Sequence, residues 1–145
     1  MGILARSIAP IFESDINPIF RCLSTHYKNC DAPVPNIGFF DIETGFCQER
    51  GYAPVADPFN PITAISIYLS HEDRCVTLVL KPDEMDCDEA EDIASKFDDT
   101  ILFDDEAEML SAFLMVIDEV DILSGWNSSL FDIPYIVNRL EILSQ

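Results

Sequence analysis

The sequence predicts an α/β fold with a mixed β-sheet, and the order of its periodic segments is the basis for this prediction. Residues 36–44, 63–69 and 75–81 are rich in β-branched and aromatic residues, as strands are. A wide apolar stripe at helical spacing follows over residues 105–120, and then a short strand at 121–127. Because a strand–helix–strand connection returns the chain in parallel, we expect this last strand to lie beside strand 36–44.

Composition indicates one globular domain. The chain has 145 residues, of which 48% are apolar and 24% charged, enough for a single core. No apolar run is long enough to span a membrane, and the N-terminus lacks the layout of a signal peptide, so we expect a cytoplasmic protein with no membrane partner. Five scattered cysteines fit neither a disulfide framework nor a zinc site, which predicts reduced thiols.

The most unusual global property is a formal net charge of −19. Sixteen of the 27 acidic residues lie between Asp83 and Asp121, where Lys96 is the only base. Such a segment repels nucleic acid at long range, and its simplest interpretation is a solvated acidic surface. Any contact with DNA must therefore be local or shared with a basic partner.

Residues 1–35 are predicted to be a lead-in segment. Residues 8–16 could be extended, and Asn17 with Pro18 then provides an N-cap and a first helical residue. That helix would continue to about Tyr27, and two prolines at residues 29–35 indicate a linker. Residues 36–145 form the domain proper.

Strand 36–44 reads as a buried strand that contains two acidic residues. Asp41 and Glu43 are two positions apart, so they project from the same face. Burying two unpaired carboxylates is costly unless a cation lies between them, and a divalent metal is the natural candidate. The alternative is that both residues are polar side chains placed where the chain leaves the core.

The other elements follow from local signals. A long loop at 45–61 contains three prolines, and loops of this length are often functional. Strands 63–69 and 75–81 are predicted to form an antiparallel hairpin. Residues 88–97 are a candidate acidic helix, 100–103 a brief extended piece, and Asp104 or Asp105 a cap for the helix that runs to Val120. A last helix should begin near Asp132, with Pro134 in its first turn.

This order brings Asp41 and the turn holding Asn127 and Asp132 to neighbouring strand ends, where mixed α/β sheets bind ligands. Taken alone, the segment 126–135 has a plain structural interpretation, with Asp132 as a helix cap and Trp126, Phe131 and Tyr135 as core aromatics. The two segments together carry more information than either one.

Together they resemble two motifs of the proofreading 3′-to-5′ exonuclease domain of family B DNA polymerases, most like those of tailed bacteriophages. The first motif, Asp-Ile-Glu on a central strand, is matched by residues 41–43. The second, an Asn, three variable residues, Phe-Asp and then Pro-Tyr, is matched by residues 127–135. The similarity runs from about residue 8 to the end and includes the segment around residues 12–16.

The resemblance implies a ribonuclease-H-like fold and hydrolysis of the 3′-terminal phosphodiester with two Mg²⁺ or Mn²⁺ ions. By analogy, Asp41 bridges both ions, Glu43 binds the ion that carries the attacking water, and Asp132 helps to hold the second. Asn127, Phe131 and Tyr135 match positions that bind the single-stranded 3′ end of DNA.

The family's third exonuclease motif, a Tyr followed by an essential Asp on a later helix, is not matched, and the only acidic residue after Asp132 is Glu141. The final strand and helix of the fold and the polymerase region are not matched either, so we expect an incomplete sheet and weak or no activity of this chain alone. Three interpretations stay open: a piece of a proofreading polymerase, half of a split polymerase completed by a partner chain, or a non-enzymatic interaction module.

Overall fold

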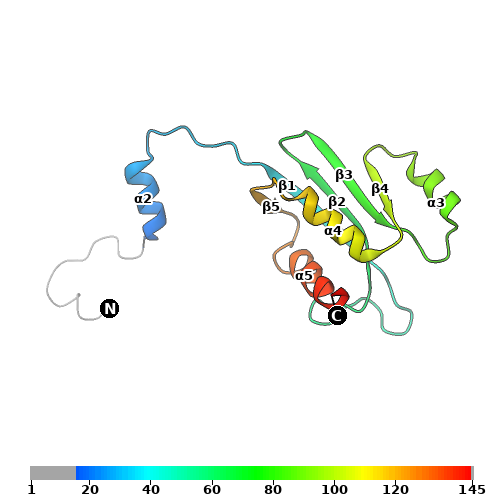
Figure 1. Ribbon diagram of the computed structural model, residues 1–145. Helices are drawn as coiled ribbons and strands as arrows, with labels where there is room; N and C mark the ends of the chain where they lie inside the picture. Colours follow the sequence, from blue (N-terminus) through cyan, green and yellow to red (C-terminus); the bar gives the residue numbers. More distant parts are fainter. Residues whose placement is uncertain (1–15, 145) are drawn as a thin grey trace. The chain divides into compact units, whose positions relative to one another are not determined.

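The computed structural model describes residues 16–144, and the chain divides into two units, Met1–Val34 and Pro35–Gln145 (Figure 1). In the first unit, helix α2 spans Pro18–His26, and none of its residues is buried. The Asn17 side chain accepts a hydrogen bond from the Ile19 backbone N–H at 2.9 Å, which confirms the predicted cap. The predicted extended segment 8–16 and the segment around residues 12–16 lie, apart from Ile16, outside the described residues.

The second unit is built on a five-stranded mixed sheet. Its strands are β1 (Ile37–Thr44), β2 (Ile62–Leu69), β3 (Arg74–Leu80), β4 (Thr100–Phe103) and β5 (Ile122–Ser124), in the order β4-β3-β2-β1-β5. The β2–β3 hairpin is antiparallel and β5 runs parallel to β1, so the α/β fold class and both of these pairings are confirmed. Segment 100–103, predicted only as an extended piece, is a full member of the sheet because it pairs in parallel with β3.

Helices cover the two faces of the sheet unequally. Helices α4 (Glu106–Val116) and α5 (Asp132–Leu143) pack on one face, where strand residues such as Phe40, Ile65 and Leu78 are buried against them. Helix α3 (Cys87–Ala94) packs on the opposite face, beside β4 (Figure 1). Both α3 and α4 are shorter than predicted. Helix α4 ends at Val116 because Ile117, at φ −90° and ψ 2°, leaves the helical region.

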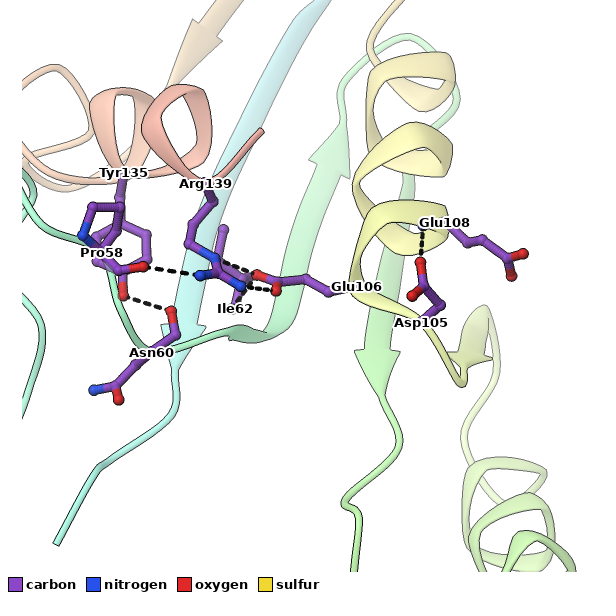
Figure 2. Close-up of polar contacts among 8 residues, drawn as sticks. All are labelled: Pro58, Asn60, Ile62, Asp105, Glu106, Glu108, Tyr135 and Arg139. Carbon is purple, nitrogen blue, oxygen red and sulfur yellow. Dashed lines mark hydrogen bonds and ion pairs between the residues drawn. The ribbon is translucent and has the colours of Figure 1, made fainter. Parts of the chain in front are cut away.

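A buried ion pair joins α4 to α5. Glu106, in the first turn of α4, accepts hydrogen bonds from the Ile62 backbone N–H at 2.7 Å and from Arg139 Nε at 2.9 Å. Arg139 Nη2 pairs with the second oxygen of Glu106, and Nη1 donates to the Pro58 carbonyl at 3.0 Å (Figure 2). Both side chains are buried, and no buried side-chain polar atom within residues 16–144 lacks a hydrogen-bond partner. Paired and fully bonded in this way, the two charges are tolerated in the interior.

The long loop 45–61 is held by side chains of α5. The Tyr135 hydroxyl donates to the Asn60 carbonyl at 2.9 Å, and the Asn138 amide donates to the Val55 carbonyl at 2.7 Å. With the bond from Arg139 to Pro58, three α5 side chains reach three backbone carbonyls of the loop (Figure 2 shows two of them). The loop is therefore part of the packing that positions α5.

Glu106→Gln is expected to lower the free energy of unfolding by about 3–5 kcal/mol, because an amide leaves the buried Arg139 charge without its counterion. Urea denaturation followed by circular dichroism measures this. Glu108→Gln is the matched control, since Glu108 is exposed in the same helical turn and has no ion pair within residues 16–144. Equal effects of the two substitutions would contradict the role assigned to Glu106.

Candidate active site

Asp41 and Glu43 lie on the same face of β1, as the spacing predicts. The side chains of Phe40 and Ile42 point into the core, whereas those of Phe39, Asp41 and Glu43 are exposed on the other face. The interpretation of 36–44 as a buried strand is confirmed for the face of Phe40 and Ile42 and wrong for the face of Asp41 and Glu43, because α4 and α5 both pack on the former. The cost of burial is therefore no argument for a metal at Asp41 and Glu43.

The buried carboxylate among the motif residues is Asp132. It lies in the first turn of α5, is only 2% exposed, and its Oδ1 accepts a hydrogen bond from the Ile42 backbone N–H at 3.3 Å. Ile42 stands between Asp41 and Glu43 in the chain. Strand β5 pairs with β1 only as far as the Phe39–Ser124 pair, so Asp132 bonds to β1 just beyond the end of that ladder.

The turn between β5 and α5 approaches β1 very closely. A Cβ atom on Gly125 would lie 2.3 Å from the Phe40 carbonyl oxygen, so only glycine fits there without a shift of the backbone. Asn127 has a φ of 58°, a left-handed conformation that Asn tolerates better than most residues. Its carbonyl accepts the backbone N–H groups of Leu130 and Phe131, both at 3.0 Å, and this closes the turn ahead of α5.

A pocket of about 460 Å³ opens where these elements meet. Its lining combines carboxylate, amide and aromatic side chains from β1, the turn and α5, namely Asp41, Ile42, Trp126, Asn127, Phe131 and Asp132. The motif residues Asp41, Asn127, Phe131 and Asp132 therefore come together at one place, while Glu43 lies outside the pocket lining. Strand β1 shifts register against β2 between Glu43 and Thr44, at the end of the strand where Glu43 stands.

Of the aromatic residues that the plain structural interpretation places in the core, Trp126 departs from that interpretation and Tyr135 follows it. Trp126 is 92% exposed rather than in the core, and it lines the pocket. Its position directly before Asn127, in a turn that follows a strand, is the signal that could have indicated this. Tyr135 is fully buried, its ring lies 5.4 Å from that of Phe131, and its hydroxyl is bonded to Asn60. Tyr135 thus has no surface with which to contact DNA.

Electrostatics sets Asp132 apart from its neighbours. Burial raises the pKa of its carboxyl group above the ordinary value, and the nearby charge of Asp41 adds to this rise. Hydrogen bonds from backbone N–H groups, that of Ile42 among them, oppose the rise in pKa. A cation near these two carboxylates would relieve their repulsion, and hard oxygen donors suit Mg²⁺ or Mn²⁺.

The arrangement brings together two carboxylates rather than three. Within residues 16–144, no group of three or more His, Cys, Asp or Glu side chains lies close enough together to hold a metal ion. Asp41 and Asp132 fit a shared divalent ion by charge and donor type. Glu43 would have to turn toward them to become a third ligand.

A family model described as DNA polymerase family B, exonuclease domain, matches residues 10–145. The chain belongs to this family. Membership places it in the lineage of polymerase proofreading exonucleases, which act on DNA together with the rest of a polymerase and generally use divalent metals. The search of curated proteins found no match. No helix in the described part of this family B exonuclease domain is long and apolar enough to cross a membrane.

Gly125→Ala is expected to lower the free energy of unfolding by about 1–3 kcal/mol, because the added methyl group would overlap the Phe40 carbonyl. The displaced turn should also loosen the bond between Asp132 and Ile42, which speeds hydrogen exchange of the Ile42 amide. Gly45→Ala is the control, since its nearest neighbour would be the Pro61 ring at 3.3 Å. An unchanged exchange rate at Ile42 in Gly125→Ala would contradict this account.

Proposed function

We propose that this chain forms the proofreading 3′-to-5′ exonuclease portion of a family B DNA polymerase. Its substrate would be the single-stranded 3′ end of DNA, and its reaction hydrolysis of the terminal phosphodiester. The main support is the bond from the Ile42 backbone to Asp132, through which the second motif meets the first at one pocket. An origin in a tailed bacteriophage and a cytoplasmic location stay predictions.

Three carboxylates would hold the metal ions in this proposal, Asp41, Asp132 and a reoriented Glu43. Two divalent ions held there would supply Lewis-acid chemistry, which would favour ionisation of the attacking water and stabilise the leaving 3′-oxygen. The chain's own contribution is to hold the carboxylates of Asp41 and Asp132 in position. The Ile42 N–H fixes Asp132, and the pairing of β1 with β2 fixes the backbone of Asp41.

The rest of the pocket would hold the DNA end. Trp126 and Phe131 offer aromatic faces, on which any base can stack, as proofreading requires. Asn127 offers amide donors and an acceptor beside them. We assign Tyr135 the task of supporting the Phe131 ring from the core rather than touching DNA.

We further propose that this chain alone cuts DNA weakly or not at all. Glu43 lies outside the pocket, and a misplacement of about 1 Å in such a site costs about 100-fold in rate. A segment of the rest of the polymerase, in the same chain or in a separate one, would complete the site. A non-enzymatic interaction module is the alternative, and metal binding at Asp41 distinguishes the two.

With Mg²⁺ or Mn²⁺, the chain is expected to show little degradation of single-stranded DNA from the 3′ end, yet to gain thermal stability. At ten times the dissociation constant of the metal, the gain would be about 1.4 kcal/mol. Asp41→Ala should abolish the gain, whereas Asp118→Ala should keep it, because Asp118 is exposed on another part of the surface. The melting temperature as a function of metal concentration measures both.

Absence of metal-dependent stabilisation in the unmodified chain would favour the interaction module. Rapid degradation that Asp41→Ala abolishes would instead show that the proposed dependence on a further segment is wrong. Metal-dependent stabilisation that survives in Asp41→Ala would place the metal elsewhere.

Trp126→Ala is expected to weaken binding of a fluorescent oligothymidylate by about 1–3 kcal/mol, the usual worth of one base stacked on an aromatic ring. Fluorescence anisotropy in the presence of Mg²⁺ measures this. Leu130→Ala is the matched control, because Leu130 is exposed in the same turn but does not line the pocket. Equal binding by the two variants would exclude Trp126 as a stacking surface.

A further inference from the structure

A second cavity lies beneath α3, near the other edge of the sheet. It has a volume of about 220 Å³, and its lining is apolar except for Thr100. Val79 and Leu102 form its floor, on the sheet face opposite to α4, and Ala90 and Ile93 of α3 form one wall. Of the residues of α3, only Ala90 is buried.

The cavity continues into exposed apolar surface. Phe97, which follows α3 and also lines the cavity, is 62% exposed, and Ile93 is 39% exposed. The helix therefore leaves apolar side chains open to solvent beside an unfilled space. The cavity is smaller than the roughly 300 Å³ at which small-molecule pockets usually begin. Its size suits one anchoring side chain of a protein partner better than a free ligand.

Exposed carboxylates lie next to residues that line this cavity. Asp83 and Glu84 lie in the turn between Pro82 and Met85, which both line the cavity, and Glu89 and Glu91 flank Ala90. All four are exposed, and none has an ion pair within residues 16–144.

The two lysines of this region are already engaged. Lys96 pairs with Asp92 at 2.8 Å, and Lys81 donates to the Met85 carbonyl and lies 3.9 Å from Asp104. The four carboxylates of Asp83, Glu84, Glu89 and Glu91, called the acidic rim of the cavity below, therefore keep a strong uncompensated negative charge.

We propose that this cavity is a docking site for a positively charged protein segment that inserts an apolar side chain between α3 and the sheet. The apolar lining supplies the anchor, since burial of a Leu or Phe side chain contributes about 1.5–3 kcal/mol. The acidic rim selects the sign of the partner's charge and speeds its approach. DNA and anionic membranes carry the wrong charge for this rim. The proposal does not rest on the exonuclease function.

The test uses the full chain and a short lysine-rich synthetic peptide with two leucines at its centre. Two control peptides carry serines in place of the leucines, or glutamates in place of the lysines. Fluorescence anisotropy of labelled peptide measures binding, and chemical shift changes of the Ile93 methyl groups locate it. We expect the leucine–lysine peptide to bind at least tenfold more tightly than either control.

Phe97→Ser is expected to weaken binding of this peptide at least fivefold. Ile93→Ala is a second cavity variant, in which a smaller part of the side chain is removed. Met115→Ser is the matched control, because Met115 is an exposed apolar residue on α4, away from this cavity.

The Glu89→Gln, Glu91→Gln double variant should weaken binding of the peptide and reduce the salt dependence of its affinity, whereas the Asp118→Asn, Glu119→Gln double variant should change neither. Thermal melts check that each variant folds.

Several results would overturn the proposal. Equal binding of the serine–lysine peptide would show attraction by charge alone, without the cavity. Equal binding of the leucine–glutamate peptide would remove the charge preference. Unchanged binding by both cavity variants, or no binding of the leucine–lysine peptide to the unmodified chain, would show that the cavity is not a docking site for such a segment.

Discussion

The ion pair between Glu106 and Arg139 is the interaction on which the rest of the second unit depends. One carboxylate receives the guanidinium of α5 and the first backbone N–H of β2, so a helix start, a helix body and a strand start meet at one point. About two helical turns separate Arg139 from Asp132. Fixing the middle of α5 in this way orients its first turn, where Asp132 reaches the backbone of β1.

Signals that act within a few residues could be read from the sequence. The cap at Asn17, a cap of α4 at Asp104 or Asp105, the β2–β3 hairpin and the start of α5 all depend on local chemistry and were predicted, and the structure places the α4 cap at Asp105. The meeting of the two motifs followed from topology, because parallel strands end at the same edge. The ion pair was not predicted, since 33 residues separate its members and neither position carries a local signal. The burial of each sheet face was not predictable either, because alternation along β1 does not say which elements cover it.

The two candidate binding sites of this unit lie near opposite edges of the sheet. The carboxylate pocket lies at β1, β5 and α5, and the apolar cavity lies at β3, β4 and α3, with β2 between them in the strand order. Most of the acidic residues belong to segment 83–121, so the surface that repels DNA includes α3 and the rim of the cavity. In the two proposals, DNA and a positively charged protein segment therefore bind at separate sites on the same sheet.

Helix α5 recognises the loop 45–61 through main-chain carbonyls, those of Val55, Pro58 and Asn60. A carbonyl oxygen is present whatever side chain its residue carries. Substitutions at the exposed positions of this loop would therefore leave these three bonds intact, whereas insertions and deletions would carry the carbonyls out of reach of α5. These contacts constrain the length of the loop more than the identity of its residues.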